Sequence, residues 1–131
     1  MNRPLHLSPA DFLPADRYAG TLVGRAWLPG AHPGPAVVAI REDGVHDISA
    51  HAATVASLLE KRDAAQIVQQ APGERLGSVE QVLAATRAGA SRDTVHFLAP
   101  CDLQVVKAAG VTFAASLLER VIEERAGGDL H

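Results

Sequence analysis

The sequence predicts an α+β fold, a small antiparallel β meander accompanied by short helices. Between residues 20 and 49, short apolar segments alternate with turn signals, which is typical of strands joined by hairpins. After residue 54 the apolar residues recur three to four positions apart, which is typical of amphipathic helices. The chain has 131 residues, 47% hydrophobic and 21% charged. This is the balance of a globular protein with one modest core.

Three strands are expected in the first half of the chain. The first covers residues 20–29, where alternate side chains are apolar and Pro-Gly ends the run. The second covers 36–41 and the third covers 45–49. The Asp-Gly pair between them favours the positive φ angles of a tight hairpin turn. Residues 1–19 are rich in Pro and Asp and are expected to form an irregular arm.

The second half is predicted to be mostly helical. A helix is expected over 54–71, ended by Pro-Gly, and another over 78–89. The second of these opens with a Ser-x-x-Gln capping box and closes on a glycine. Apolar runs at 94–100 and 103–111 predict two further strands, and a last helix is expected over 116–126.

Charge and composition exclude several classes of protein. The net charge is -3, and the 12 Lys and Arg residues are scattered, whereas a nucleic-acid-binding protein needs a concentrated basic face. No apolar stretch is long enough to cross a membrane, and the first residues lack the apolar core of a signal peptide. The single cysteine, Cys101, excludes an internal disulfide framework. The simplest location is therefore the cytoplasm.

Two small groups of polar residues invite a functional interpretation. His46, Asp47 and His51 are close enough in sequence to suggest a metal site, but neighbouring residues of a strand point to opposite faces, so exposed turn histidines are the simpler reading. Cys101 stands beside Asp102, whose negative charge disfavours a reactive thiolate. Trp27 is expected to provide packing area rather than a binding surface.

The segment from Lys107 to Gly128 carries most of the functional information. It reads as a strand that leads into a helix with one apolar stripe, formed by Leu117, Leu118, Val121 and Ile122. Ser116 and Glu119 form a Ser-x-x-Glu capping box, so Glu119 has a purely structural reading, in which it accepts a backbone N–H bond at the helix start. The alternative is that these residues border an active site.

A family resemblance favours the active-site reading. The stretch "DLQVVKAAGVTFAASLLERVIEERAGGD" (102–129) resembles the fumarylacetoacetate hydrolase family, and in particular the longer bacterial members similar to 2-keto-3-deoxy sugar-acid dehydratases. Much of that family has the motif G-L-N-Y-x-D-H-x-x-E at this point. Gly110 and Glu119 match it, Phe113 replaces the tyrosine, and Ser116 replaces the histidine, as in the dehydratase-like branch.

The resemblance implies a domain organisation and a chemistry. Residues 1–100 would be an N-terminal α+β domain, and 101–131 the strand and helix that begin a β-rich catalytic domain, whose remainder this chain lacks. The intact enzyme would be a cytoplasmic, Mg²⁺-dependent hydrolase or dehydratase (a lyase) acting on a 2-keto acid, and the family suggests a homodimer. The family's metal sits on a Glu-x-Glu pair and a later Asp, and this chain has no Glu-x-Glu. The chain by itself is therefore expected to be inactive and to bind no cofactor.

The same resemblance implies roles for individual residues. Glu119 and Ser116 would be catalytic, with Glu119 the candidate for proton transfer or for ordering a water. Gly110, Thr112 and Phe113 would contact the substrate. A second reading stays open, a standalone α+β module that binds a partner or self-associates without catalysis. It is motivated by the lack of a metal cluster or catalytic triad in the sequence and by the apolar stripe of the last helix.

Overall fold

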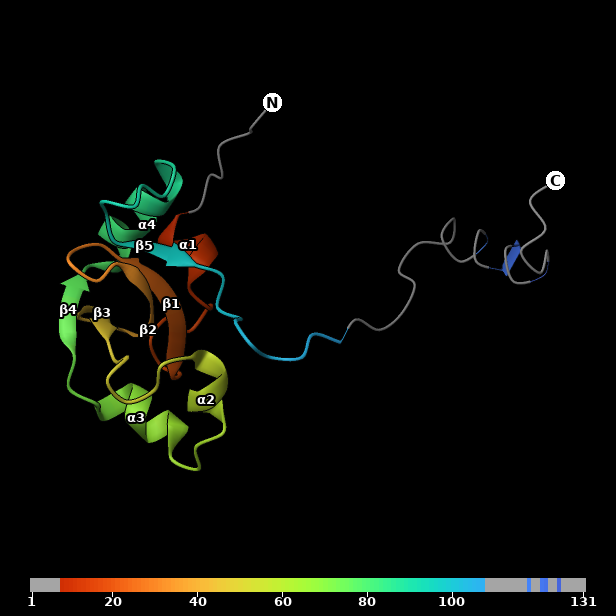
Figure 1. Ribbon diagram of the computed structural model, residues 1–131, viewed down its shortest axis with the longest axis horizontal. Coiled ribbons are helices and arrows are strands. Elements are labelled where there is room, and N and C mark those ends of the chain that lie inside the picture. Colours follow the sequence, from red (N-terminus) through yellow and green to blue (C-terminus); the bar gives the residue numbers. More distant parts are fainter. Residues whose placement is uncertain (1–7, 108–117, 119–120, 123–124, 126–131) are drawn as a thin grey trace.

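The computed structural model describes residues 8–107 together with Leu118, Val121, Ile122 and Arg125 (Figure 1). Five strands form one sheet in the order β4-β3-β2-β1-β5, and every neighbouring pair is antiparallel. The elements are α1 (Pro9–Phe12), β1 (Leu22–Leu28), β2 (Gly34–Arg41), β3 (Gly44–Asp47), α2 (Val55–Leu59), α3 (Ala64–Gln70), β4 (Glu74–Gly77), α4 (Val79–Arg87) and β5 (His96–Leu98). The described domain therefore has the α+β class that the sequence predicts.

Helices cover both faces of the sheet. α1 and α4 lie over one face and α2 and α3 over the other (Figure 1). The central strand β2 is consequently buried on both sides, which explains its uninterrupted apolar run. The core beside α1 and α4 contains Leu13, Ala26, Val38, Ile40, Val45, Val79, Val82, Leu83 and Phe97. The core beside α2 and α3 contains Val37, Ala39, Ile48, Ala52, Val55, Leu58, Val68 and Ala71.

The predicted meander of β1, β2 and β3 is confirmed. β1 pairs with β2 through Gly24↔Val38, and β2 pairs with β3 through Ala39↔His46. Gly44, in the hairpin between β2 and β3, has φ +142°, a conformation that L side chains rarely adopt. A side chain at this position would also come within 2.5 Å of the Gly77 carbonyl oxygen on β4. Glycine is therefore required here by both conformation and packing.

The single helix predicted over 54–71 is wrong, because the structure has two helices, α2 and α3, separated by a turn at residues 60–63. In one straight helix, at 3.6 residues per turn, the apolar pair Val55 and Leu58 would point about 140° away from Val68 and Ala71. The turn rotates the second helix so that both pairs enter the same core. Tertiary packing therefore sets the break.

The structure differs from the sequence prediction at two further places, β4 and residues 103–107. β4, over residues 74–77, was not predicted, because its exposed Glu74 and Arg75 lack a strand-like apolar pattern. The strand expected over 103–111 is absent from its described part, since residues 103–107 belong to no helix or strand. Two of the predicted elements are confirmed with shorter bounds, α4 with its Ser78–Gln81 capping box and β5.

The expected irregular arm is also partly wrong. Within its described part, Ser8 and Asp11 form a capping box that opens the short helix α1. Phe12 stacks on Phe97 of β5, with ring centroids 4.6 Å apart, and Leu13 is buried in the core. This segment therefore closes one face of the sheet. In the described part of the chain, no helix is long and apolar enough to cross a membrane.

Candidate functional site

The predicted site residues lie outside the described part of the chain. This applies to the catalytic pair, Ser116 and Glu119, and to the substrate-binding residues, Gly110, Thr112 and Phe113. Their roles therefore stay predictions. What the structure does describe is the route by which the chain approaches this segment and the surfaces of the domain it leaves.

The described residues of the last helix carry an exposed apolar stripe. Leu118, Val121, Ile122 and Arg125 are helical, as predicted. Leu118 is 61% exposed, Val121 40% and Ile122 62%. Large apolar side chains are seldom left so open next to one another unless they cover another surface.

The chain leaves the sheet through an anchor formed by Arg25, Asp102 and the first residues of α2. The guanidinium of Arg25, on β1, donates to two carbonyl oxygens of the chain that follows β5, those of Ala99, at 3.2 Å, and Cys101, at 3.0 Å. Its Nε lies 3.6 Å from Asp102 Oδ2. The Asp102 carboxylate accepts from the backbone N–H groups of Val55, at 2.7 Å, and Ala56, at 3.1 Å. We call this group the Asp102 anchor.

The Asp102 carboxylate satisfies donors that the short helix α2 cannot satisfy itself. The first N–H groups of any helix lack intrahelical partners, and here the Thr54 side chain accepts from Ser57 N–H while Asp102 takes the two earlier groups. Burial of Asp102 alone would raise its pKa. Hydrogen bonds from the backbone N–H groups of Leu103, Val55 and Ala56, with the Arg25 charge, outweigh burial and lower the pKa below its ordinary value. The anchor is therefore ionised at neutral pH.

The anchor determines where the predicted site segment starts. Asp102 has a side chain only 6% exposed and is tied to a helix 46 and 47 residues earlier in the sequence. From Leu103 onward the described side chains are mostly exposed, including Lys107. The chain is thus held on the domain at Asp102, and its described residues from 103 to 107 follow directly from this point.

The suggested metal residues do not come together. His46 is 8% exposed, not an exposed turn residue as expected, and its Nε2 lies 3.0 Å from Asp43 Oδ1. This hydrogen bond with His46 is the main reason that the pKa of Asp43 is lowered. Asp47 accepts from Ser49 N–H, whereas His51 is exposed. Among the described residues, no group of three His, Cys, Asp or Glu side chains is placed to hold a metal ion.

Cys101 and Trp27 both take part in hydrogen bonds near β5. Cys101 is an exposed free thiol whose backbone, rather than its sulfur, takes part in the anchor. Trp27 donates from Nε1 to the Arg92 carbonyl oxygen at 2.9 Å, and the Arg92 guanidinium lies over its ring. The tryptophan thereby fixes the loop before β5.

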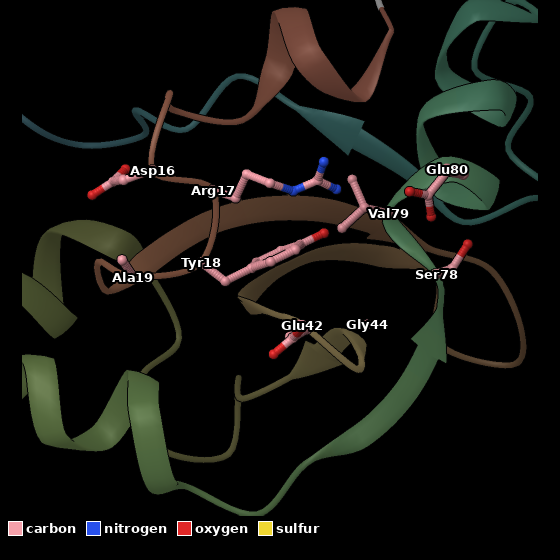
Figure 2. A pocket seen from close by; sticks show the side chains of 9 residues that line it. All are labelled: Asp16, Arg17, Tyr18, Ala19, Glu42, Gly44, Ser78, Val79 and Glu80. Atoms are coloured by element: carbon pink, nitrogen blue, oxygen red, sulfur yellow. The ribbon is translucent and has the colours of Figure 1, made fainter.

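An open hollow of about 570 Å³ lies where three loops meet, between α1 and β1, between β2 and β3, and at the start of α4 (Figure 2). Arg17 and Tyr18 extend from the first loop toward the start of α4 (Figure 2). The Arg17 guanidinium lies 5.8 Å from the centre of the Tyr18 ring, within range of a cation–π contact. Arg17 also has φ 54°, which is uncommon for a residue with a side chain.

The hollow is predominantly acidic. Its lining includes the carboxylates of Asp16, Glu42 and Glu80 against one guanidinium, that of Arg17. The pKa of Glu80 is lowered, chiefly by its own backbone N–H and by Ser78, with a smaller effect of the Arg17 charge. Such a lining suits hydrogen bonding to a small polar or cationic group. The sequence reveals none of this, because the residues come from three loops far apart in the chain.

Comparison of the chain with known protein families, with curated proteins and with solved structures finds no match. The functional interpretation therefore depends on the residues themselves. Two features matter for it, the predicted site segment and the Asp102 anchor that positions its start.

Proposed function

We propose that the chain is the N-terminal domain of a fumarylacetoacetate hydrolase family enzyme that acts on a 2-keto acid, as a hydrolase or a dehydratase. The observation that carries the proposal is the resemblance over residues 102–129, with Gly110 and Glu119 at the family's motif positions. The fold is compatible with it. The described domain has its own core on both faces of the sheet, and the chain is anchored at Asp102, where the resemblance begins in the sequence.

In this proposal each motif residue acts at the border between the two domains. The Glu119 carboxylate accepts a proton or orders a water next to the substrate, as a general base needs to do. The Ser116 hydroxyl donates or accepts a hydrogen bond, because a serine by itself is too weak a base near neutral pH. Gly110 allows close approach of the substrate, and Thr112 and Phe113 line its path.

The residues that the structure describes do not form a Mg²⁺ site. Mg²⁺ prefers carboxylates and water in octahedral geometry, and the chain has neither a Glu-x-Glu pair nor, in its described part, three converging acidic side chains. In the proposal the metal ligands therefore belong to the catalytic domain that follows. Titration of this chain with Mg²⁺ is expected to give a Kd in the millimolar range or weaker.

The proposal is tested by turnover of 2-keto acids by the full gene product in the presence of Mg²⁺. We expect Glu119→Gln to lower kcat by at least about 100-fold, the size of effect that general acid–base groups usually have. Leu118→Ala, at the neighbouring position in the sequence, serves as the control for local disturbance. Unchanged turnover in Glu119→Gln would show that the proposed role is wrong.

A second candidate function has its own supporting observation. Leu118, Val121 and Ile122 are 40–62% exposed on one short helical stretch, as in a module that docks onto a partner or onto its own copy. Under this alternative the chain has no catalytic role and forms a monodisperse dimer in light scattering. A monomer at every concentration would count against it.

A further inference from the structure

The buried imidazole of His46 lies between two hydrogen-bond acceptors. Its Nε2 is 3.0 Å from Asp43 Oδ1, and its Nδ1 is 3.4 Å from the Gly73 carbonyl oxygen. An ionised carboxylate and a carbonyl oxygen can only accept, and a neutral imidazole has a single N–H group to donate. The imidazolium has two such groups. Only the imidazolium therefore donates to both acceptors.

Charged groups reach His46 from three elements of the fold. Asp43 faces the ring from the β2–β3 hairpin, and the hydrogen bond with His46 is the main reason that the pKa of Asp43 is lowered, so Asp43 is ionised at neutral pH. On β4, Glu74 is exposed, and Arg75 donates from Nε to the Asp43 carbonyl oxygen at 2.7 Å. The Arg41 guanidinium, on β2, donates to carbonyl oxygens at the end of α3, and α3 carries no titratable side chain. Asp43 is thus the anionic partner of the ring.

The Gly73 contact joins His46 to the edge of the sheet. Gly73 directly precedes β4, an edge strand of four residues that pairs, among the described strands, with β3 alone. The register of this pairing shifts between Val45 and His46, beside the imidazole. Such an irregularity disrupts the ladder locally. A short edge strand of this kind opens at a lower free energy than the centre of the sheet, so one side-chain contact matters to it.

We propose that His46 is a pH-dependent clasp for β4, in which the imidazolium joins Asp43 to Gly73 and the loss of one proton releases Gly73. The remaining proton stays on Nε2, because the bond to the carboxylate is the shorter one and is charge-assisted. The Nδ1 lone pair then faces the Gly73 carbonyl oxygen, which has lost its donor. The clasp is therefore complete at acidic pH and is lost as the pH rises through the range in which histidine titrates, about pH 5–8. None of these residues belongs to the predicted catalytic segment.

The first test reads the protons on the His46 ring by NMR in the full-length, isotope-labelled chain. Near pH 5 we expect both ring nitrogens to be protonated, and near pH 8 only Nε2. The signals are assigned by their loss in His46→Gln. His51→Gln is the matched control, because His51 is exposed and should leave the His46 signals unchanged. A ring with one proton near pH 5, or a proton retained on Nδ1 near pH 8, would contradict the clasp.

The second test asks whether protonation of His46 fastens β4. Amide hydrogen exchange, corrected for the intrinsic exchange rate at each pH, reports local opening of the strand. Between pH 5 and pH 8, the protection of the β4 amides should fall about tenfold, the effect of losing one hydrogen bond to a charged group. In His46→Gln the protection should no longer depend on pH, whereas His51→Gln should behave as the parent.

Thermal unfolding of both variants checks that the domain stays folded. If His46→Gln does not fold, the wild-type chain still decides, because its ring protons and its β4 protection are measured without the variant. Equal protection of β4 near pH 5 and near pH 8 in the wild-type chain would overturn the proposal. The same pH dependence in a folded His46→Gln chain would overturn it as well.

Discussion

Gly73→Ala is the substitution for which the structure predicts the sharpest effect. Gly73 directly precedes β4, and a Cβ added at this position would point at the backbone of β3. A Cβ here would overlap the Asp47 carbonyl oxygen and come within 2.9 Å of the carbonyl carbon. Both atoms belong to the backbone, so no side-chain rotation relieves the overlap. The two strands must separate where Asp47 pairs with Glu74.

The expected cost follows from this separation. Overpacking in a tight site costs about 1–3 kcal/mol, and loss of one backbone hydrogen bond adds about 1 kcal/mol. The free energy of unfolding should therefore fall by about 2–4 kcal/mol. In urea, with a slope near 2 kcal/mol per molar, the midpoint should fall by about 1.5 M.

Gly20→Ala and Gly34→Ala are the matched controls. Neither glycine has any atom within 4 Å of an added Cβ, and neither has a positive φ in the strained range. Both variants should keep their stability or gain up to about 1 kcal/mol, because alanine restricts the unfolded chain. If Gly73→Ala stays within about 0.5 kcal/mol of the parent in the same titration, the close approach of β3 and β4 is wrong.

Three further predictions address the helices and the anchor. Leu58 is fully buried, whereas the side chain of Leu59 is 58% exposed. Leu58→Ala should therefore lower the free energy of unfolding by about 2–5 kcal/mol, and Leu59→Ala by less than about 0.5 kcal/mol. Equal losses for the two variants in urea titrations would contradict the placement of α2. Arg41 donates from Nε and Nη2 to the carbonyl oxygens of Val68 and Ala71 at the end of α3. Lysine lacks the forked guanidinium group, so Arg41→Lys should lower the free energy of unfolding by about 1–3 kcal/mol. An unchanged free energy of unfolding would show that these bonds do not stabilise the end of α3. The pKa of Asp102 is lowered from its ordinary 3.8, so the anchor should be complete above pH 3.8 and be lost only as the pH falls through the lower folded-state value. The Val55 amide proton shift should report that midpoint in NMR, and a midpoint above 3.8 would contradict the anchor.

Local sequence signals account for the parts of the fold that were predicted correctly. The turn around Gly44 and the alternation along β1 are visible in a few adjacent residues, and so is the capping box of α4. Each feature is stabilised by contacts close in sequence, so the pattern and the structure agree.

The rest depends on contacts between distant residues. β4 is a strand because it pairs with β3, not because its own charged residues favour one. The break between α2 and α3 is set by a core that both helices share. The Asp102 anchor joins residues 46 and 47 positions apart, and the hollow around Tyr18 collects three loops. No spacing of residues in the sequence predicts the Asp102 anchor or this hollow. The predicted catalytic residues, Ser116 and Glu119, lie outside the described part of the chain.

The most direct test of the proposed function is the nucleotide sequence of the source gene beyond the codon for His131. We predict an open reading frame that encodes a Glu-x-Glu pair and a later Asp, the ligands that a Mg²⁺-dependent enzyme of the proposed family requires. A stop codon directly after His131 would contradict the enzyme proposal and leave the self-association module as the better account.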